Sequence, residues 1–402
     1  MLRRGSSTLR GAMVNLRRGA TSIARAGWWS SSMTTVLELF AGCGGAALGL
    51  HRAGWQHLAC VERDEAAAAT LTAAGLPALL ADVRAVDWGA FAGRVDLLWA
   101  SPPCQPGSTA GKRQGAADDR DGWPWTWAAI DAVRPTWFLA ENVLGWTYHA
   151  RSCSLDGEHH GCVGCAWERS ILPKLRARFA FSGSWTLDTA DYGTPQHRRR
   201  VLLWGGPVPL ADAPPPPSHG DPDDEDTEHR GLRPWVSVRE AVGATLLAED
   251  TCEKRACYPC DGSHGRACSE PWRADRPAPT VTTTEVKGTR AHAPMWSFNG
   301  GPDRASDAAF LVAGVRRIEV VEGLVLQGLP ADWPLQGTRE QQYRQVGNAV
   351  PPPMAEALGR VVLGAHRVVE DLRARAVDLD ALADALRRNP SAVPARLGRR
   401  AA

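Results

Sequence analysis

An apolar run at residues 36–40 breaks into the glycine-rich stretch 42–45, and an alanine- and leucine-rich segment follows it as far as Gly54. This order predicts a strand, a tight turn and a helix, because glycine adopts the left-handed backbone that such a turn needs. The N–H groups of the turn can then approach a ligand at the carboxyl end of the strand. Glycine-rich turns also occur without a ligand, so this motif alone does not establish one.

The same pattern recurs directly afterwards. Residues 57–62 are predicted to form a second strand, Asp64 a helix N-cap, and Gly75 the end of an alanine-rich helix. Further apolar runs, separated by helical spacers, occupy residues 79–82, 96–100 and 137–140. Alternating strands and helices predict an α/β fold with a parallel sheet and helices on both faces.

Length, composition and charge limit the choice of partners. The chain has 402 residues, 44% of them hydrophobic, which fits one large domain plus a smaller one. No apolar run approaches the roughly 18 residues that span a bilayer, so no membrane partner is expected. The formal charge is +2, but residues 1–35 carry six arginines and no acid, and the rest is slightly acidic. Nucleic acid must therefore be held by local basic clusters. The candidates are Lys112/Arg113, Arg176/Arg178, residues 198–200 and Arg316/Arg317.

Residues 1–32 differ from the rest of the chain. They are rich in arginine, serine, alanine and glycine, a composition similar to that of an organelle transit peptide. The alternatives are a disordered extension, which we adopt, or an upstream start, because Met33 stands just before the first strand. The ten cysteines do not indicate secretion, since no apolar signal segment accompanies them. We expect a cytoplasmic protein encoded by a bacterium or a phage.

The regular pattern is interrupted once. Residues 206–275 contain four consecutive prolines, an acidic run and four cysteines, which indicates a flexible insert or a small specificity domain. The pattern returns at Val320 and ends in a long amphipathic helical stretch over residues 354–386.

Two acids strengthen the interpretation of the glycine turn as a ligand site. Glu62 ends the second predicted strand, where a carboxylate can accept hydrogen bonds from ribose hydroxyls, and Asp82 ends the third, where an adenine amino group could lie. The alternative for each is a solvated acid at a strand end. Together the two carboxylates predict an adenosine pocket.

Cys104 is the candidate nucleophile. It follows Pro102 and Pro103 at the end of a predicted strand and precedes the polar, glycine-containing stretch 107–122. The prolines fix the backbone, and a flexible loop can close over a substrate. A buried structural cysteine is the ordinary alternative. Glu141 follows 37 residues later, and Arg198 and Arg200 come after a further gap.

Six motifs in series resemble those of the cytosine-C5 DNA methyltransferase family. They read Phe-x-Gly-x-Gly-Gly, Pro-Cys-Gln, Glu-Asn-Val, Gln-x-Arg-x-Arg, Arg-Pro-x-Pro-Thr and Gly-Asn-Ala-Val-Pro-Pro. In this chain they occupy residues 40–45, 103–105, 141–143, 196–200, 276–280 and 347–352. Single motifs occur by chance, but six in the family's order are a specific signal. The resemblance covers residues 36–205 and 275–362.

The resemblance implies a Rossmann-like methyltransferase fold, a mostly parallel mixed sheet with helices on both faces, plus a smaller target-recognition domain. The implied organisation is a catalytic and cofactor-binding domain at 33–205, target recognition at 206–275, a return segment at 276–390 and a tail at 391–402.

The implied reaction transfers a methyl group from S-adenosyl-L-methionine to C5 of a flipped cytosine. Cys104 would add to C6, Glu141 would hydrogen-bond N3, and Arg198 and Arg200 would fix the nucleotide and its phosphates. All of this needs an extrahelical base. Where the family often has an aromatic residue after Pro-Cys-Gln, this chain has Pro106-Gly107-Ser108-Thr109. This substitution loosens the catalytic loop.

By the same resemblance, six residues surround the cofactor. They are Phe40, Gly42, Gly44, Glu62, Asp82 and Asn348. The turn that carries Asn348 has an alternative role, which is to dock the C-terminal helix onto the sheet. Arg276 and Thr280 would support the target-recognition region and the catalytic loop.

The remaining cysteines form two groups with histidines. The first holds Cys153, Cys162, Cys165, His159 and His160, and the second holds Cys252, Cys257, Cys260, Cys268 and His264. Each contains a Cys-x-x-Cys pair, the spacing that lets two thiolates bind one tetrahedral Zn²⁺. Free surface thiols are the alternative, and no metal ligand is assigned from the sequence.

Three functions follow from these motifs. The leading one is a monomeric methyltransferase of double-stranded DNA, with a cognate restriction endonuclease as a genetic rather than physical partner. The first alternative is an RNA (tRNA) cytosine-C5 methyltransferase. The second is a catalytically inactive DNA-binding relative. The long region after Gly205 favours DNA, because duplex readout needs extra surface in the grooves.

Overall fold

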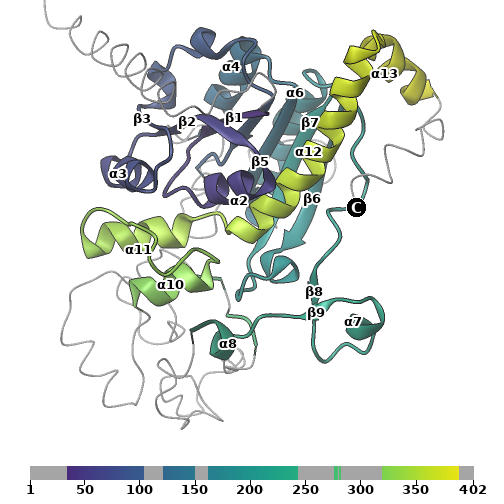
Figure 1. The fold of residues 1–402 in the computed structure, drawn as a ribbon. Coiled ribbons are helices and arrows are strands. Elements are labelled where there is room, and N and C mark those ends of the chain that lie inside the picture. Colours follow the sequence, from purple (N-terminus) through teal and green to yellow (C-terminus); the bar gives the residue numbers. More distant parts are fainter. Residues whose placement is uncertain are drawn as a thin grey trace, which may run out of the picture.

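The computed structural model describes residues 34–103, 121–149, 162–242, 276–278, 280–281 and 319–388. Within these residues, seven strands form one sheet in the order β3-β2-β1-β4-β5-β7-β6 (Figure 1). The strands are β1 (Thr35–Leu39), β2 (Gln56–Glu62), β3 (Ala78–Leu80), β4 (Leu97–Ala100), β5 (Trp137–Val143), β6 (Phe181–Asp188) and β7 (Arg199–Gly206). Strands β1 to β5 are parallel, whereas β7 is antiparallel to both β5 and β6. This topology confirms the predicted α/β fold with a mostly parallel mixed sheet.

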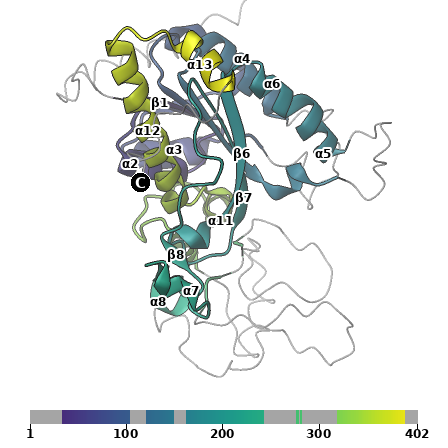
Figure 2. The same cartoon turned by 90° about the vertical axis from the view of Figure 1, so that its right-hand side faces the viewer.

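Helices cover both faces of the sheet. They are α2 (Gly45–Ala53), α3 (Glu65–Ala73), α4 (Trp123–Val133), α5 (Val163–Ala166), α6 (Leu172–Arg176), α12 (Pro352–Ala374) and α13 (Leu379–Arg388). Figure 2 shows α2 and α12 on one side of β6 and β7, and α4, α5 and α6 on the other.

The side chains of the strands pack into two separate cores, because successive side chains of a pleated strand point to opposite faces of the sheet. In β5, Trp137 and Leu139 pack into the core that α2 and α12 share. Phe138 and Ala140 pack into the opposite core, beneath α4 and the segment α5–α6. A strand that is buried on both faces explains why the sequence shows continuous apolar runs rather than alternation.

Glycines let α2 and α12 touch through their backbones. A Cβ on Gly45 would overlap the carbonyl oxygen of Val350, and one on Gly49 would overlap that of Pro352 and lie 2.7 Å from the Cβ of Ala355. The start of α2 therefore lies directly against the chain that enters α12. Because α2 follows the glycine turn, this contact places the C-terminal segment beside the turn.

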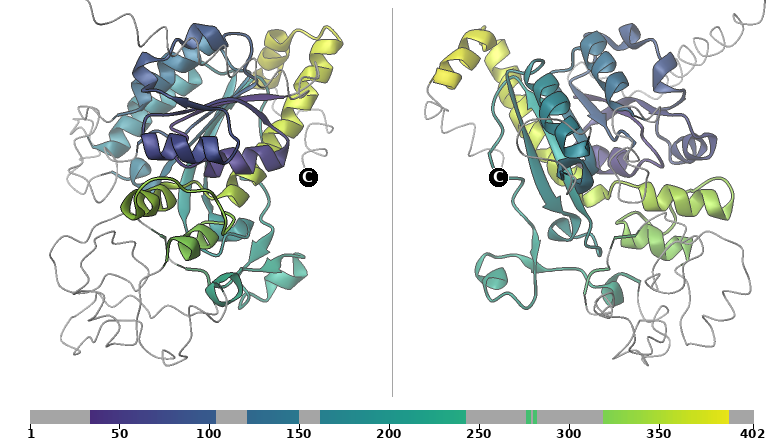
Figure 3. Two further views of the ribbon diagram at one scale, coloured as in Figure 1. Left: turned by 60° about the vertical axis from the view of Figure 1, so that its left-hand side comes forward. Right: turned by 180° about the vertical axis from the view of Figure 1, so that it is seen from behind.

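A smaller group of helices lies beyond the carboxyl edge of the sheet, below it in both views of Figure 3. It comprises α8 (Val238–Val242), α10 (Val320–Leu326) and α11 (Arg339–Asn348). Its core contains Val238, Leu324, Leu326 and Val346, and it reaches Cys43 of the glycine turn. The short elements β8 (His219–Gly220), α7 (Asp226–His229) and β9 (Arg233–Pro234) follow β7.

The predicted helical stretch over residues 354–386 is wrong in one respect, since it consists of two helices. Ala376 has a left-handed backbone with φ of 56°, which ends the first helix. The Asp378 carboxylate then accepts hydrogen bonds from the N–H groups of Asp380 and Ala381 at the start of α13. Amphipathic spacing continues through such a break, so the pattern did not reveal it.

Several predictions fall outside the described residues. These are the extension at 1–32, the tail at 391–402, and residues 243–275 of the expected target-recognition region. Within the described part of the chain, no helix combines the length and the apolar character needed to cross a membrane.

We expect Gly49→Ala to lower the free energy of unfolding by about 1–3 kcal/mol, because the new methyl group overlaps the backbone of α12. In an open helix the same change would raise stability by about 1 kcal/mol. Urea denaturation measures the difference. Arg52→Ala, at an exposed position of the same helix, is the control and should change stability by less than about 0.5 kcal/mol. A gain in stability for Gly49→Ala would contradict the close packing.

His366 should make the protein sensitive to mild acid. Its ring lies on α12, 5.9 Å from the Trp55 ring, with Nε2 3.8 Å from Oδ1 of Asp96. Burial lowers the pKa of His366, and Asp96 and Glu370 offset this only partly while Arg373 adds to it. Below the unfolded value of about 6.5, the unfolded chain binds a proton that the folded chain does not, so stability falls as the pH falls.

The measurement is urea denaturation at pH 7.5 and pH 5.5. Wild type should lose more stability between these values than His366→Phe, by up to about 1.4 kcal/mol per pH unit. His51→Gln, exposed on α2, should follow the wild-type slope. Equal slopes for wild type and His366→Phe would refute the role of His366.

Candidate active site

Three parallel strands end at the same edge, and backbone contacts join the segments that leave them. Ser101 N donates to the Leu39 carbonyl at 3.2 Å, so the chain after β4 runs beside the glycine turn, defined here as residues 40–45. The amide of Asn142 in β5 donates to the Pro102 carbonyl at 3.1 Å. The Phe-x-Gly-x-Gly-Gly, Pro-Cys-Gln and Glu-Asn-Val motifs therefore meet at one place.

The glycine turn has the left-handed backbone that its sequence predicts. Phe40, Gly42 and Gly44 have φ values of 57°, 55° and 89°. No atom lies within 4 Å of a Cβ built on Gly42, so the turn opens onto free space there. Gly44 is closed in by comparison, because its Cβ would approach the Leu71 and Leu76 side chains.

Glu62, at the end of β2, braces this turn. One carboxylate oxygen accepts a 2.8 Å hydrogen bond from Gly42 N, and the other accepts from the N–H groups of Arg63 and Asp64, both at 2.8 Å. A carboxylate offers about four acceptor positions, so capacity remains for a hydroxyl group. The turn therefore offers open space at Gly42 with a carboxylate acceptor beside it.

Asp82 follows β3 and has a partner that the sequence analysis did not anticipate. Its carboxylate caps the next helical turn and accepts from Nε and Nη2 of Arg84 at 2.9 and 2.6 Å. The hydrogen-bonded Arg84 guanidinium lowers the pKa of Asp82. Asp82 is therefore an ionised acceptor at neutral pH, and an adenine amino group would share it with Arg84.

Asn348 ends α11 and is exposed. Two residues later, the Val350 carbonyl touches Gly45, which places Asn348 beside the glycine turn. The motif around Asn348 thus docks the chain that enters α12 against α2, and a contact of Asn348 with the cofactor stays a prediction.

Cys104 lies outside the described residues, as do Lys112 and Arg113. The two ends of the segment 104–120 are described and lie together. A Cβ on Gly122 would come within 2.9 Å of Pro102, Pro103 and the Phe40 ring, so the chain returns to the point where it left. The loop that carries Cys104 therefore has both of its ends at the glycine turn.

Glu141 forms a buried ion pair with Arg200. Nε of Arg200 lies 2.7 Å from Oε1 of Glu141, and the two side chains are 9% and 11% exposed. In the antiparallel register Glu141 faces Leu202 and Val143 faces Arg200, so the ion pair is a diagonal neighbour contact. A charged pair this deeply buried fixes the position of both groups.

Arg198 makes different contacts. Its guanidinium donates to the carbonyl oxygens of Val281 at 3.0 Å and Gly347 at 3.1 Å, and its side chain is buried. It thereby ties the Gln-x-Arg-x-Arg motif to the two C-terminal motifs.

Gln196 joins the same segments. Its amide oxygen accepts from Val281 N at 2.7 Å, and its amide nitrogen donates to the Leu326 carbonyl at 3.0 Å. Thr280 donates its hydroxyl to the His197 carbonyl at 2.8 Å, and Arg276 forms ion pairs with Asp221 and Asp223 of the acidic run.

Asn142 had no role assigned to it from the sequence. It is buried, and its amide group holds the Pro102 carbonyl while its oxygen accepts from Val143 N at 2.8 Å. The signal was present in the Glu-Asn-Val motif, of which only the acid had been given a role.

Cys43 in the glycine turn and Cys60 in β2 are both fully buried. Burial raises the pKa of the Cys43 thiol to about 12 and that of Cys60 well above its usual range.

Of the two Cys/His groups, Cys162 and Cys165 are described, whereas Cys153, His159, His160 and the whole group at 252–268 lie outside the described residues. Among the other basic clusters, Arg178 pairs with Asp131, and Arg316 and Arg317 are outside the described residues.

Solved structures with the same architecture confirm the fold. Dnmt2 methyltransferase of S. pombe matches with a TM-score of 0.52 at 16% identity, covering 81% of this chain and 97% of that one. The methyltransferase EhMeth of Entamoeba histolytica matches with a TM-score of 0.52 at 15% identity, covering 82% and 97%.

Sequence comparisons are more specific. Type II methyltransferase M.NgoMIV of Neisseria gonorrhoeae is 30% identical over 352 residues, which cover 82% of this chain and 97% of the relative. Type II methyltransferase M.NaeI of Lentzea aerocolonigenes is 29% identical over 371 residues, covering 86% and 78%. The family description "C-5 cytosine-specific DNA methylase" matches residues 34–211 and 266–363. Because these ranges span most of the chain and hold all six motifs, the protein belongs to the C-5 cytosine-specific DNA methylase family.

Proposed function

We propose that this DNA cytosine-5 methyltransferase uses S-adenosyl-L-methionine to methylate C5 of a flipped cytosine in a specific duplex sequence, through a covalent bond between Cys104 and C6. The buried Glu141–Arg200 ion pair is the observation that carries the proposal. Glu141 lies in β5, and its neighbour Asn142 contacts Pro102, two residues before Cys104. The glycine turn opens at the same edge of the sheet. A nucleophile, an acid and a cofactor turn are the three parts that this chemistry requires.

The residues act in sequence. The Cys104 thiolate forms a bond to C6, while Glu141 donates a proton to N3, which takes up the electron pair displaced through the ring. The ring becomes an enamine, whose C5 is nucleophilic. S-adenosylmethionine, when bound, supplies an electrophilic methyl group. C5 bonds to this methyl group as the bond between the methyl carbon and the cofactor sulfur breaks. A base then removes the proton from C5, and the electrons of that C–H bond restore the C5–C6 double bond as the Cys104 sulfur leaves C6.

The two arginines have separate roles in this proposal. Arg200 orients the Glu141 carboxylate through its 2.7 Å contact and lies where it can reach the nucleotide. Arg198 was expected to touch the nucleotide as well, but its two carbonyl contacts favour a positioning role. It would hold β7 in register with the C-terminal segments, so that Arg200 stays beside Glu141.

The cofactor would be held by the residues at the glycine turn. Gly42 leaves space for it, Glu62 would accept from its ribose hydroxyls, and Asp82 would accept from its adenine amino group. Phe40, Gly44 and Asn348 would complete the pocket, Phe40 through its ring beside Pro102 and Pro103.

Duplex DNA is the proposed substrate because the two relatives above are Type II methyltransferases, to which this chain is 30% and 29% identical over the aligned residues. Residues 206–275 would read the target sequence. We propose that the chain acts as a monomer in the cytoplasm of a bacterium or phage host, with a restriction endonuclease as its genetic partner.

Cys104→Ser should abolish transfer of labelled methyl groups to duplex DNA while leaving duplex binding intact, because a hydroxyl is a far weaker nucleophile than a thiolate. Wild type should form a covalent adduct with DNA that contains 5-fluorocytosine, since fluorine at C5 blocks the final elimination. Cys60→Ala, which removes a buried thiol from the core, is the matched control and should retain both activities.

Three outcomes would contradict parts of this proposal. Transfer to tRNA alone would assign an RNA substrate. Absence of both transfer and adduct would assign a non-catalytic DNA-binding protein. Methylation by Cys104→Ser at the wild-type rate would exclude the covalent route.

Variants of Glu141 and Arg198 should separate catalysis from positioning. Glu141→Gln should lower kcat by about 10²–10⁴-fold, because it removes the acid that assists thiolate addition. Arg198→Met should lower the free energy of unfolding by about 3 kcal/mol, since two buried carbonyls lose a charged donor. The fall in kcat of this variant should be smaller at low temperature than at higher temperature. Wild-type stability combined with lost turnover in Arg198→Met would show that Arg198 contacts the substrate.

A further inference from the structure

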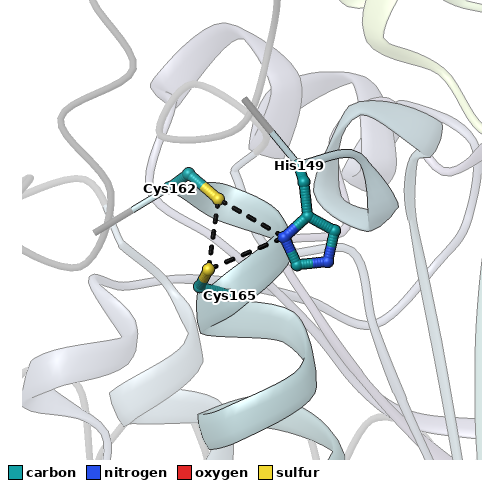
Figure 4. Close-up of side chains that lie close together, drawn as sticks. All are labelled: His149, Cys162 and Cys165. Atoms are coloured by element: carbon teal, nitrogen blue, oxygen red, sulfur yellow. Dashed lines mark hydrogen bonds between the residues drawn. The ribbon is translucent and has the colours of Figure 1, made fainter. Parts of the chain in front are cut away.

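Two cysteines and a histidine that the catalytic proposal does not use lie together just after β5 (Figure 4). Nδ1 of His149 is 3.7 Å from Sγ of Cys162 and 3.6 Å from Sγ of Cys165, and the two sulfurs are 3.4 Å apart. His149 follows the helical turn Leu144–Thr147, whereas the cysteines stand at the start of α5. The three donors therefore come from two segments of the chain.

These separations match those around one tetrahedral ion. With metal–sulfur and metal–nitrogen distances of about 2.3 and 2.1 Å, tetrahedral geometry puts two sulfurs about 3.8 Å apart and a sulfur about 3.6 Å from a nitrogen. The sulfurs are too far apart for a disulfide, whose bond length is about 2.05 Å. The imidazole presents Nδ1 to both sulfurs, as three ligands of one ion require.

Glu168 supports the orientation of the histidine. Its Oε1 lies 3.2 Å from Nε2 of His149, on the ring atom opposite the one that faces the sulfurs. Metal-binding histidines usually donate their second N–H to a carboxylate in this way, which fixes the tautomer and leaves the other nitrogen as a ligand. Cys162 and Cys165 stood out in the sequence through their Cys-x-x-Cys spacing, whereas His149 and Glu168 did not.

A glycine lets the two segments approach. A Cβ on Gly164, between the cysteines, would lie 2.8 Å from the Tyr148 carbonyl carbon and 2.9 Å from His149 N. The Cys-Val-Gly-Cys turn therefore packs directly on the backbone of His149. Cys165 is buried, Cys162 is half-buried and the His149 side chain is 31% exposed, so an ion could enter from solvent.

We propose that His149, Cys162 and Cys165 bind one Zn²⁺ ion, with Glu168 as the carboxylate that orients His149. Two thiolates and an imidazole are the donor set that zinc prefers among biological metals. A water molecule or another ligand would complete the tetrahedron.

The ion would act as a structural staple. His149 stands eight residues after Glu141, so the ion would join the exit of the catalytic strand to the helical segment α5–α6, which packs on the sheet. Trp146, between Glu141 and His149, is buried in the same core. Binding at both ends of this short connection would stabilise the folded chain, because the site does not exist in the unfolded one.

The test measures zinc itself, so its result does not depend on methyl transfer. The full chain is purified with zinc, passed through a desalting column and measured for bound metal. We expect about one more equivalent of zinc in wild type than in Cys162→Ser or His149→Ala. Cys60→Ala, which removes a thiol elsewhere, should keep the wild-type content. Cobalt in place of zinc should give thiolate-to-metal charge-transfer absorption that Cys165→Ser loses.

Glu168→Gln tests the geometry without removing a ligand. Glu168 is exposed, so this variant should fold, and its zinc affinity should fall about 10- to 100-fold in competition with a chromophoric chelator. A wild-type chain that retains no zinc would overturn the proposal, as would zinc content unchanged by Cys162→Ser. Unchanged affinity in Glu168→Gln would also overturn the assigned site.

Discussion

The backbone contact between α2 and the chain entering α12 holds the structure together. Gly45 and Gly49 allow the carbonyls of Val350 and Pro352 to touch α2 where any larger residue would collide. Close-packed backbones gain dispersion contacts on both sides and leave no space for water. The consequence is that the first motif and the last motif lie side by side at the glycine turn. Cys43 and Trp333 reinforce this junction, because the Trp333 indole donates to the Cys43 carbonyl at 2.9 Å.

The reversed strand β7 explains how Glu141 obtains its partner. In a fully parallel sheet, a strand beside β5 would begin at the edge opposite Glu141. Because β7 runs antiparallel, its first residues lie at the carboxyl end of β5, and Arg200 reaches Glu141. The guanidinium of Arg198 is buried nearby. Two backbone carbonyls from the C-terminal segments accept its hydrogen bonds and offset the cost of removing it from water. Polar groups in this position must be satisfied, which ties strand register to the C-terminal motifs.

Local patterns were enough to predict much of the fold, and long-range contacts account for what they missed. The five parallel strands were visible as apolar runs between helical spacers, and the glycine turn as a break with left-handed residues. The break at Ala376 was hidden, since amphipathic spacing continues across it. Asn142 and His149 were missed for another reason: their partners, Pro102 and Cys165, stand 40 and 16 positions away, and no periodicity encodes such a pairing.

The cysteines show how one residue type takes different roles through its surroundings. Cys43 and Cys60 are fully buried, where a thiolate would lose its hydration, and the nearby Glu38 carboxylate adds repulsion, so the pKa of both thiols is raised. Cys162 and Cys165 stand at the start of a helical segment, with both sulfurs within 3.7 Å of Nδ1 of His149. Cys104 follows two prolines whose positions are fixed by Asn142 and Gly122. The surroundings of each of these cysteines are therefore set by which segments of the chain meet.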